Sequence, residues 1–312
     1  RNRRKQILLV TIKKFIYKVR PSLCLVMETE LWPNMFFYCE QGDIPVILAS
    51  ARLSLRSLKG YMRFRELLCQ TLDSTTRVLA QSKLDAERYL MLGCQPRKLS
   101  VIGNLKYDVE IPTGLIEKGE SMRLNQFSNR SVWIAASTHS NEESLVLDAH
   151  RQVLEKIEDA ILILAPRHPH RFEKVAKLCA KKNFELVRKS EDKPISAQTN
   201  VYLLDTLGDL QLFISCADVA FMGGSLVPSG GHNMLEPASL GVPVVSGTSI
   251  YNFQSICDSL IDVGALCLVS DSDELAEEIG TLLGDKNMSS LMGGHGRKLL
   301  GQNQGCSDKI IS

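Results

Sequence analysis

The chain has 312 residues, more than the roughly 250 to 300 that one hydrophobic core usually holds, so two α/β domains are expected. Its 37 Lys and Arg residues nearly balance 35 Asp and Glu residues, which gives no reason to expect a nucleic-acid partner. No apolar run of about 18 residues occurs, and nine cysteines are scattered without a C-x-x-C pair. These residues therefore predict no membrane-spanning helix, zinc site or disulfide framework, and a reducing, intracellular setting fits them.

The first twenty residues hold eight basic side chains and no acidic one. Apolar residues recur at helical spacing from Leu8 to Val19, which predicts an amphipathic helix that ends before Pro21. One interpretation is a crossover helix with a solvated basic face, and the other is contact with an anionic membrane surface. The chain begins with Arg1 rather than Met, which fits a missing N-terminal portion.

Strands and helices alternate through the first half, with strands predicted at residues 23–27, 44–49, 77–80 and 99–102. Ligands of open α/β sheets bind where strands end. Glu28 and Glu30 follow the first strand and are candidates for acceptor contacts or a general base, although Glu30 can also cap the next helix. Arg52 and Arg56 follow the second strand, where they can clamp an anionic group or simply lie on the surface.

Periodicity is lost between residues 109 and 130, where glycines and a proline appear, and this predicts an interdomain linker. The predicted organisation is a first domain at 1–110, a linker at 111–130 and a second domain at 131–312. The second domain has predicted strands at 132–136, 161–164, 201–204, 217–222, 242–245 and 265–269. Ser140 and Glu143 have the spacing of a capping box for the helix after its first strand.

Three loops that follow these strands carry candidate ligand contacts. His139 follows the first strand, and Arg167 follows the second, where an arginine suits a phosphate or a nucleotide base. His168 and His170 form a metal site only with further ligands, and none is evident. The loop Leu207-Gly208-Asp209 precedes a helix, so its backbone N–H groups can receive a nucleotide.

The stretch 221–237 reads F-M-G-G-S-L-V-P-S-G-G-H-N-M-L-E-P and combines a strand end, two glycine pairs and a helix start. Such a junction binds anions because first-turn N–H groups have no intrahelical partner, so a phosphate is expected. Glu236, one turn into the helix, can reach ribose hydroxyls, which favours a nucleotide. The spacing fits neither G-x-G-x-x-G nor a Walker A loop. A glycine turn that merely joins a strand to a packed helix is the alternative.

Only the second half carries such a loop, so the donor nucleotide is expected there. The acceptor is then expected to face it from the first half across a cleft, in two Rossmann-like domains. This asymmetry is typical of a GT-B glycosyltransferase.

Seven blocks, in this order, resemble bacterial 3-deoxy-D-manno-octulosonic acid (Kdo) transferases. They are E-T-E-L-W-P-N (28–34), A-R-L-S-L-R-S (51–57), G-N-L-K-Y-D (103–108), A-S-T-H-S-N-E-E (136–143), P-R-H-P-H-R-F (166–172), D-T-L-G-D-L (205–210) and G-G-S-L-V-P-S-G-G-H-N-M-L-E-P (223–237). The resemblance implies an inverting GT-B enzyme that needs neither metal nor cofactor. Such enzymes move Kdo from CMP-Kdo to the lipid A precursor (lipid IVA) in lipopolysaccharide synthesis, at the cytoplasmic face of the bacterial inner membrane.

The resemblance also implies roles for individual residues. The donor nucleotide would be held by Arg167, Leu207, Gly208, Asp209, Gly230, Gly231, Asn233 and Glu236, with Glu236 on the ribose. The acceptor or the Kdo would contact Glu28, Arg52, Arg56, Lys106 and His139. No metal ligand is implied.

Three departures from the family pattern qualify this reading. Relatives begin with a membrane-anchoring segment and an S-V-G-E block whose glutamate is the presumed base. Neither block occurs in this sequence, so the family base is expected upstream of Arg1, and Glu28 and Glu30 are the fallback candidates within this chain. Relatives read G-P-H where this chain has Gly247-Thr248-Ser249, and they carry Glu at the position of Asp209. The alternatives are another nucleotide-sugar enzyme, such as a non-hydrolysing 2-epimerase that prefers UDP, and a non-catalytic nucleotide-binding fragment.

Overall fold

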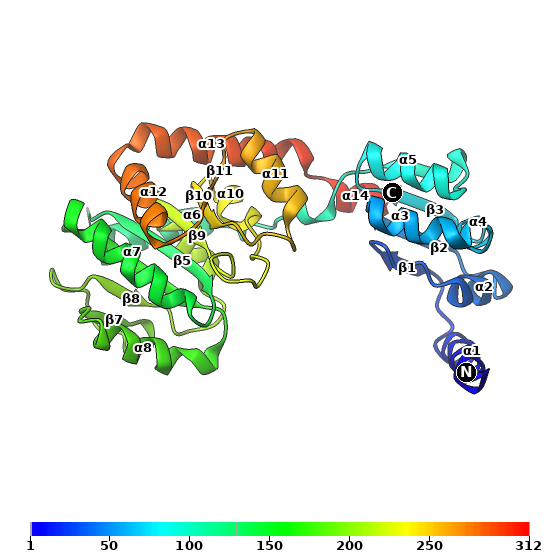
Figure 1. Ribbon diagram of the computed structural model, residues 1–312, viewed down its shortest axis with the longest axis horizontal. Coiled ribbons are helices and arrows are strands. Elements are labelled where there is room, and N and C mark those ends of the chain that lie inside the picture. The colour runs from blue at the N-terminus through cyan, green and yellow to red at the C-terminus, as the bar shows by residue number, and fades with distance from the viewer. Residues whose placement is uncertain (1, 129, 312) are drawn as a thin grey trace. The chain divides into compact units, whose positions relative to one another are not determined.

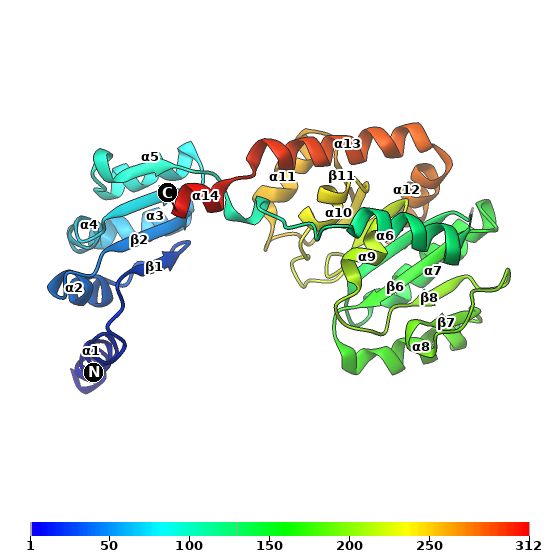
Figure 2. The ribbon, with the colours of Figure 1, turned by 180° about the vertical axis from the view of Figure 1, so that it is seen from behind.

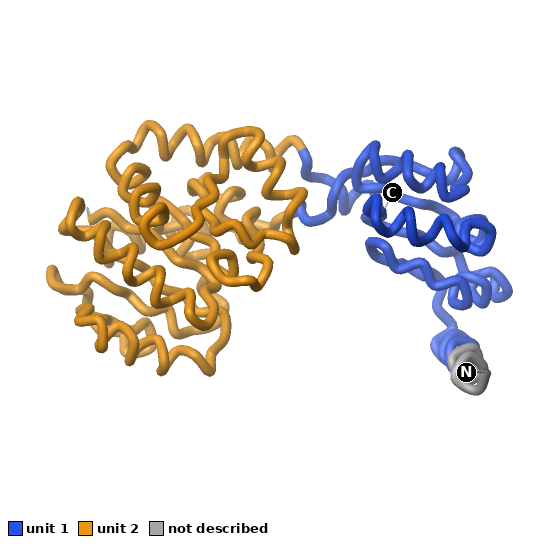
Figure 3. Tube along the Cα trace, viewed as in Figure 1, with its two compact units in different colours: residues 1–108, 303–312 blue, residues 109–302 orange. Residues whose placement is uncertain are grey.

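The computed structural model describes residues 2–128 and 130–311, with side chains described from Thr11 to Ile310 except at position 129. The chain divides into two compact units, each with its own parallel β-sheet (Figure 3). Unit 1 comprises residues 1–108 and 303–312, and unit 2 comprises residues 109–302. Among the described residues, no helix combines the length and the apolar character needed to cross a bilayer.

Unit 1 is built on a four-stranded sheet in the order β1-β2-β3-β4, with every neighbouring pair parallel. Its elements are α1 (Asn2–Val19), β1 (Cys24–Met27), α2 (Pro33–Gln41), β2 (Val46–Ala51), α3 (Leu55–Tyr61), η1 (Met62–Phe64), α4 (Arg65–Asp73), β3 (Arg77–Ala80), α5 (Lys83–Leu92), η2 (Pro96–Lys98), β4 (Leu99–Val101), η3 (Leu105–Tyr107) and α14 (Cys306–Ile311). The core includes Phe36, Leu48, Leu72 and Tyr89, which are almost completely buried. Parallel strands need crossover connections, and the helices between them supply the residues that bury the sheet.

The C-terminal segment belongs to unit 1, which differs from the predicted second domain of 131–312. Hydrogen bonds to Asp108 hold the C-terminal segment against unit 1. Its carboxylate accepts hydrogen bonds from the N–H groups of Gly305 and Ser307, at 2.8 and 2.6 Å, at the start of α14. Cys306 is fully buried and its thiol donates to the carbonyl of Ile102 at 3.2 Å. A side chain at the end of the first domain therefore anchors the other end of the chain.

Unit 2 is built on a seven-stranded parallel sheet in the order β11-β10-β9-β5-β6-β8-β7. Its elements are α6 (Leu115–Met122), η4 (Arg123–Phe127), β5 (Val132–Thr138), α7 (Glu142–Lys156), β6 (Ile161–Pro166), η5 (Pro169–Arg171), α8 (Phe172–Lys181), β7 (Leu186–Arg188), η6 (Lys189–Glu191), β8 (Val201–Leu203), α9 (Leu210–Ser215), β9 (Val219–Met222), α10 (Leu235–Leu240), β10 (Val244–Gly247), α11 (Gln254–Asp262), β11 (Leu266–Val269), α12 (Ser272–Gly284) and α13 (Lys286–Asn303). Helices α7 and α12 lie side by side on one face of the sheet, and α6 and α9 lie on the other (Figures 1 and 2). Both faces of the central strands are therefore covered.

The predicted linker at 111–130 is structured, because it forms α6 and the π-helical turn η4. Gly119 lies in α6, where an added Cβ would approach the Ser215 hydroxyl to 2.1 Å, so the glycine permits close packing of α6 on α9. Arg123 pairs with Asp218 at 2.7 Å and donates to the carbonyl of Arg130 at 2.7 Å. The segment is thus part of unit 2 rather than a flexible connection.

A buried histidine joins the first strand of unit 2 to its neighbours. The indole N–H of Trp133 donates to His150 Nδ1 at 3.1 Å, and His150 Nε2 lies 2.8 Å from the carbonyl oxygen of Asn200. A carbonyl only accepts, so Nε2 carries the proton and the ring is neutral. The pKa of His150 is lowered to about 3, mainly by burial. The hydrogen bond to Asn200 opposes this shift, while the nearby charges of Arg130 and Arg151 contribute to it.

We expect His150 to make the free energy of unfolding depend on pH. Its pKa lies below the unfolded value of 6.5, so the unfolded state binds more protons and stability falls as pH drops from 6.5 toward about 3. The loss is at most about 1.4 kcal/mol per pH unit. His150→Gln keeps one acceptor and one donor but does not titrate. Urea unfolding of both proteins between about pH 7 and about pH 4 should show the wild type losing stability relative to the variant, and a constant difference would contradict this assignment.

Candidate functional site

Most of the predicted donor residues follow strands of unit 2 that lie next to one another in the sheet. The strands β10, β9, β5, β6 and β8 are consecutive and parallel, so the loops after them emerge at one edge. These loops carry Thr248, Gly223, His139, Arg167 and Gly208. The topology therefore brings the candidate residues to the edge where open α/β sheets bind ligands.

The first glycine turn, residues 223–226, was predicted as part of the phosphate site, and the structure corrects this prediction. Its N–H groups are already occupied by the carboxylate of Glu142, which is completely buried. The carboxylate accepts from the backbone N–H groups of His139, Gly224, Ser225 and Leu226 at N···O distances of 3.0, 2.7, 3.0 and 3.0 Å. An anion of the chain itself fills this turn, so a ligand phosphate cannot use the same donors.

The second glycine turn, residues 230–233, is held between the first turn and the loop after β10. Gly230 and Gly231 have φ angles of 87° and 74°, which favour glycine. The N–H of Gly231 donates to the Gly224 carbonyl at 2.8 Å, and the N–H of Gly230 donates to the Ser249 hydroxyl at 3.2 Å. Ser249 therefore anchors the turn.

Two histidines meet beside the second glycine turn. His139 Nε2 and His232 Nε2 are 2.8 Å apart, and their rings are stacked. The pKa of His232 is lowered to about 4, mainly by burial, and the nearby His139, Arg167 and His168 contribute to this shift. The hydrogen bond requires one nitrogen with a proton and one without, so a single proton lies between the two Nε2 atoms beside the glycine turn.

Arg167 is exposed at the end of β6, and its backbone N–H donates to the carbonyl of Thr138 at 3.0 Å. Its charge is close enough to Glu236 and His232 to lower the pKa of both groups. His168, the next residue, packs edge-on against His139 with ring centroids 5.7 Å apart, so the loop that carries Arg167 lies beside the His139–His232 pair.

Glu236 lies in the first turn of α10 with Asn233 beside it. Burial raises the pKa of Glu236, and the hydrogen bond from Asn233 and the charge of Arg167 oppose that shift. Asn233 Nδ2 lies 3.4 Å from Glu236 Oε1, while Asn233 Oδ1 accepts from the N–H of Leu235 at 3.2 Å. Asn233 therefore both caps the helix and orients the carboxylate.

The loop Leu207-Gly208-Asp209 lies at the same sheet edge but farther along it, after β8. Leu207 is 74% exposed, and Gly208 has a φ of 94° with open space where a Cβ would be. Thr206 donates to Asp209 at 2.6 Å, which shapes the loop from within. The loop therefore presents exposed backbone at this part of the sheet edge.

The acceptor candidates in unit 1 are partly paired with one another. Glu28 has a φ of 58° and forms an ion pair with Lys106 at 3.3 Å. Glu30 accepts from the Trp32 indole N–H at 2.6 Å. Arg52 is half-buried after β2, and Arg56 is exposed in the first turn of α3.

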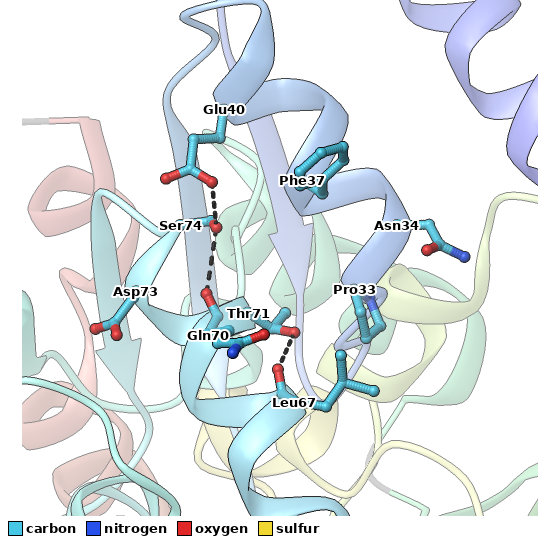
Figure 4. A pocket seen from close by; sticks show the side chains of 9 residues that line it. All are labelled: Pro33, Asn34, Phe37, Glu40, Leu67, Gln70, Thr71, Asp73 and Ser74. Carbon is cyan, nitrogen blue, oxygen red and sulfur yellow. Dashed lines mark hydrogen bonds between the residues drawn. The ribbon is translucent and has the colours of Figure 1, made fainter.

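A surface pocket of unit 1 lies elsewhere. It has a volume of about 450 Å³ and lies between α2 and α4 (Figure 4). Within it the Ser74 hydroxyl donates to Glu40 at 2.8 Å. The residues that line it are Pro33, Asn34, Phe37, Glu40, Leu67, Gln70, Thr71, Asp73 and Ser74, and none of them was predicted as a site residue.

Metal-ligating side chains do not gather within the described part of the chain, where no group of three or more His, Cys, Asp or Glu residues has a metal-binding arrangement. His168 and His170 stack on each other at 5.4 Å.

The sequence did not predict the structural roles of Glu142 and Glu143. The predicted capping box is wrong, because α7 begins at Glu142 after Asn141, whose side chain makes no cap, and Glu143 instead pairs with Arg171 at 2.7 and 2.9 Å. Glu142 gave no signal of its own beyond its place in the block A-S-T-H-S-N-E-E. Three of its four partners are 82 to 84 residues away, and only the fold brings them to Glu142.

The sequence of this chain was compared with family models and with known proteins. The model of the 3-deoxy-D-manno-octulosonic-acid transferase (kdotransferase) N-terminal region matches residues 8–109. A 3-deoxy-D-manno-octulosonic acid transferase of Haemophilus influenzae is 38% identical over 302 residues, which cover 96% of this chain and 71% of that protein. The chain spans 59 to 63% of the length of several other relatives.

Solved structures agree with both the fold and the family. The crystal structure of the C-terminal CMP-Kdo binding domain of WaaA from Acinetobacter baumannii matches with a TM-score of 0.58 and 34% identity, covering 61% of this chain and 99% of that one. A UDP-GlcNAc 2-epimerase from Neisseria meningitidis shares the fold with a TM-score of 0.58 at 15% identity, over 95% of this chain and 79% of that one.

These likenesses and the two parallel sheets confirm the predicted α/β fold of the GT-B type. The extent of the identity to the Haemophilus protein also confirms the predicted family. The chain belongs to the 3-deoxy-D-manno-octulosonic acid transferase family of glycosyltransferases.

Proposed function

We propose that unit 2 binds CMP-Kdo at the second glycine turn, and that the protein transfers Kdo to the lipid A precursor with inversion and without a metal. One observation carries the donor site: the His139–His232 pair and the Asn233–Glu236 pair meet at one glycine turn, and His168, next to Arg167, packs edge-on against His139 with ring centroids 5.7 Å apart. The related Acinetobacter domain is a CMP-Kdo binding domain, which supports the choice of donor.

The charges suit a leaving phosphate. In the transfer, an acceptor hydroxyl oxygen bonds to the anomeric carbon of Kdo, the bond from that carbon to the CMP phosphate breaks, and CMP leaves with the electron pair. Arg167 would neutralise charge on that phosphate, as metal ions do in other transferases. The acceptor proton passes to a base, for which Glu28 and Glu30 are the candidates within this chain. They are held by Lys106 and Trp32, respectively.

Transfer of radiolabelled Kdo from CMP-Kdo to lipid IVA, with chelator present, tests this function. Label in the lipid is the expected result, and Arg167→Ala should reduce it. Conversion of a UDP-sugar to its epimer would instead favour the epimerase alternative. CMP binding with no label transferred would favour the non-catalytic alternative.

The ribose assignment makes a separate prediction. Glu236 is expected to accept hydrogen bonds from ribose hydroxyls, so Glu236→Ala should weaken CMP binding by about 1 to 3 kcal/mol, the scale of a hydrogen bond to a charged group. The variant should also lose the preference of the wild type for CMP over its 2′,3′-dideoxy analogue. Calorimetric titration of both nucleotides into both proteins measures the difference. An unchanged preference in a folded variant would remove Glu236 from the ribose.

We further propose that unit 1 contacts the anionic membrane surface that holds the acceptor, at the cytoplasmic face of the inner membrane. The described cations of α1 and its end, Lys13, Lys14, Lys18 and Arg20, are exposed. The side chains of Arg1, Arg3, Arg4 and Lys5 lie outside the described residues. Cations near an anionic surface contribute about 1 kcal/mol each. Co-sedimentation with anionic vesicles that is absent, or that ignores salt, would count against this contact.

A further inference from the structure

The buried carboxylate of Glu142 has the surroundings of a bound anion. Both oxygens accept two backbone N–H groups each, at 2.7 to 3.0 Å, and the residue is completely buried. Successive backbone N–H groups at a glycine turn form the concave sites that bind phosphate in other proteins. In this chain Glu142, the first residue of helix α7, fills that place.

We propose that Glu142 is a positioning residue of the donor site, an internal anion that closes the first glycine turn to phosphate and fixes the second. This inference rests on the proposed donor site for its ligand, but its structural part stands alone. The four hydrogen bonds hold the turn whether or not a nucleotide is present.

The contacts lead directly from Glu142 to the proposed phosphate position. Glu142 accepts from the N–H of Gly224, and the Gly224 carbonyl accepts from the N–H of Gly231 at 2.8 Å. A Cβ on Gly224 would lie 3.1 Å from the His232 ring and 3.3 Å from the His139 ring, so this backbone supports both histidines. Movement of the first turn must therefore move the second turn and its histidines.

The geometry also explains why other side chains cannot replace the glutamate. Each carboxylate oxygen serves two donors, whereas glutamine would turn its NH₂ group toward two N–H groups. Aspartate is one methylene shorter and cannot reach the same donors without moving the helix. A buried donor that loses its acceptor is destabilising.

Glu142→Ala removes atoms that acetate can replace, and this gives a direct test. The variant is expected to melt roughly 5 to 10 °C below the wild type. Its affinity for CMP should fall at least about fivefold, the lower end of typical coupling between sites. Excess sodium acetate should restore both toward wild type, while acetamide and sodium chloride at the same concentration should not. Glu155→Ala, an exposed position on the same helix, should change neither value.

Each outcome decides the inference. If the variant melts and binds CMP as the wild type does, or if acetamide acts as well as acetate, Glu142 is not an internal anion. If the variant does not fold, refolding yields with acetate and with acetamide are compared, and equal yields overturn the proposal. Acetate rescue of melting without rescue of CMP affinity would reject the positioning role. A wild type that binds no CMP counts against the proposed function, and the melting experiment then judges Glu142 by itself.

Discussion

Gly247→Ala is expected to destabilise unit 2 by at least about 3 kcal/mol, the upper range for an added methyl group in a packed core. An added Cβ would lie 2.3 Å from both the carbonyl carbon and the oxygen of Ser225, and 2.5 Å from the nitrogen of Leu226. These are backbone atoms of the first glycine turn, which Glu142 holds from the other side, so they cannot move without breaking its hydrogen bonds. The sheet end and the turn are therefore expected to separate.

Urea unfolding followed by tryptophan fluorescence measures this loss, since Trp133 is buried in unit 2. Gly280→Ala is the matched control, because its Cβ would meet only the end of the Lys156 side chain at 3.8 Å. That change lies inside α12 and should be neutral or stabilising by up to about 1 kcal/mol. Equal stability of the Gly247 variant and the wild type would show that the first glycine turn is free to move.

Arg167→Ala is expected to weaken CMP binding by about 1.5 to 3 kcal/mol, or roughly 10- to 100-fold. Arg167 follows β6 in the loop whose His168 packs on His139 at 5.7 Å, and there we propose that it neutralises the nucleotide phosphate. Arg167→Lys keeps the charge but loses the planar fork, and an intermediate affinity is expected.

Lys177→Ala provides the control for net charge, because it removes one positive charge from an exposed side chain of α8 that pairs only weakly with Glu173, at 3.7 Å. Its CMP affinity should match the wild type when both are titrated at the same salt concentration. An Arg167→Ala protein that folds and binds CMP as tightly as this control would remove Arg167 from the donor site.

The strand pattern of the fold was largely predictable because parallel strands are short apolar runs. The predicted strand at 132–136 is β5 and the one at 161–164 is β6, each extended by two residues in the structure. The strand β7 was missed, since its three residues at the sheet edge are only half-buried and give no apolar run. Helix α6 was read as a linker because Gly119 resembles a helix breaker. Gly119 allows α6 to pack closely against Ser215, which lies 96 positions away in the sequence.

The sequence predicted site residues only where charged or polar side chains follow a predicted strand or begin a predicted helix. Arg167 follows β6, while Asn233 and Glu236 lie at the start of α10, where Asn233 Nδ2 is 3.4 Å from Glu236 Oε1. The sequence could not show which of the two glycine pairs is filled by a side-chain carboxylate, because both have the same composition. That distinction depends on Glu142, whose carboxylate reaches the first pair only after β5 and β9 have paired.

Calorimetric titration of the folded chain with CMP, UMP and UDP tests the central claim, a cytidine-nucleotide donor site in unit 2, most directly. We predict that CMP binds at least about tenfold more tightly than UMP and UDP, a difference of about 1.4 kcal/mol. Tighter binding of UDP, or no binding of any of the three nucleotides, would contradict the account.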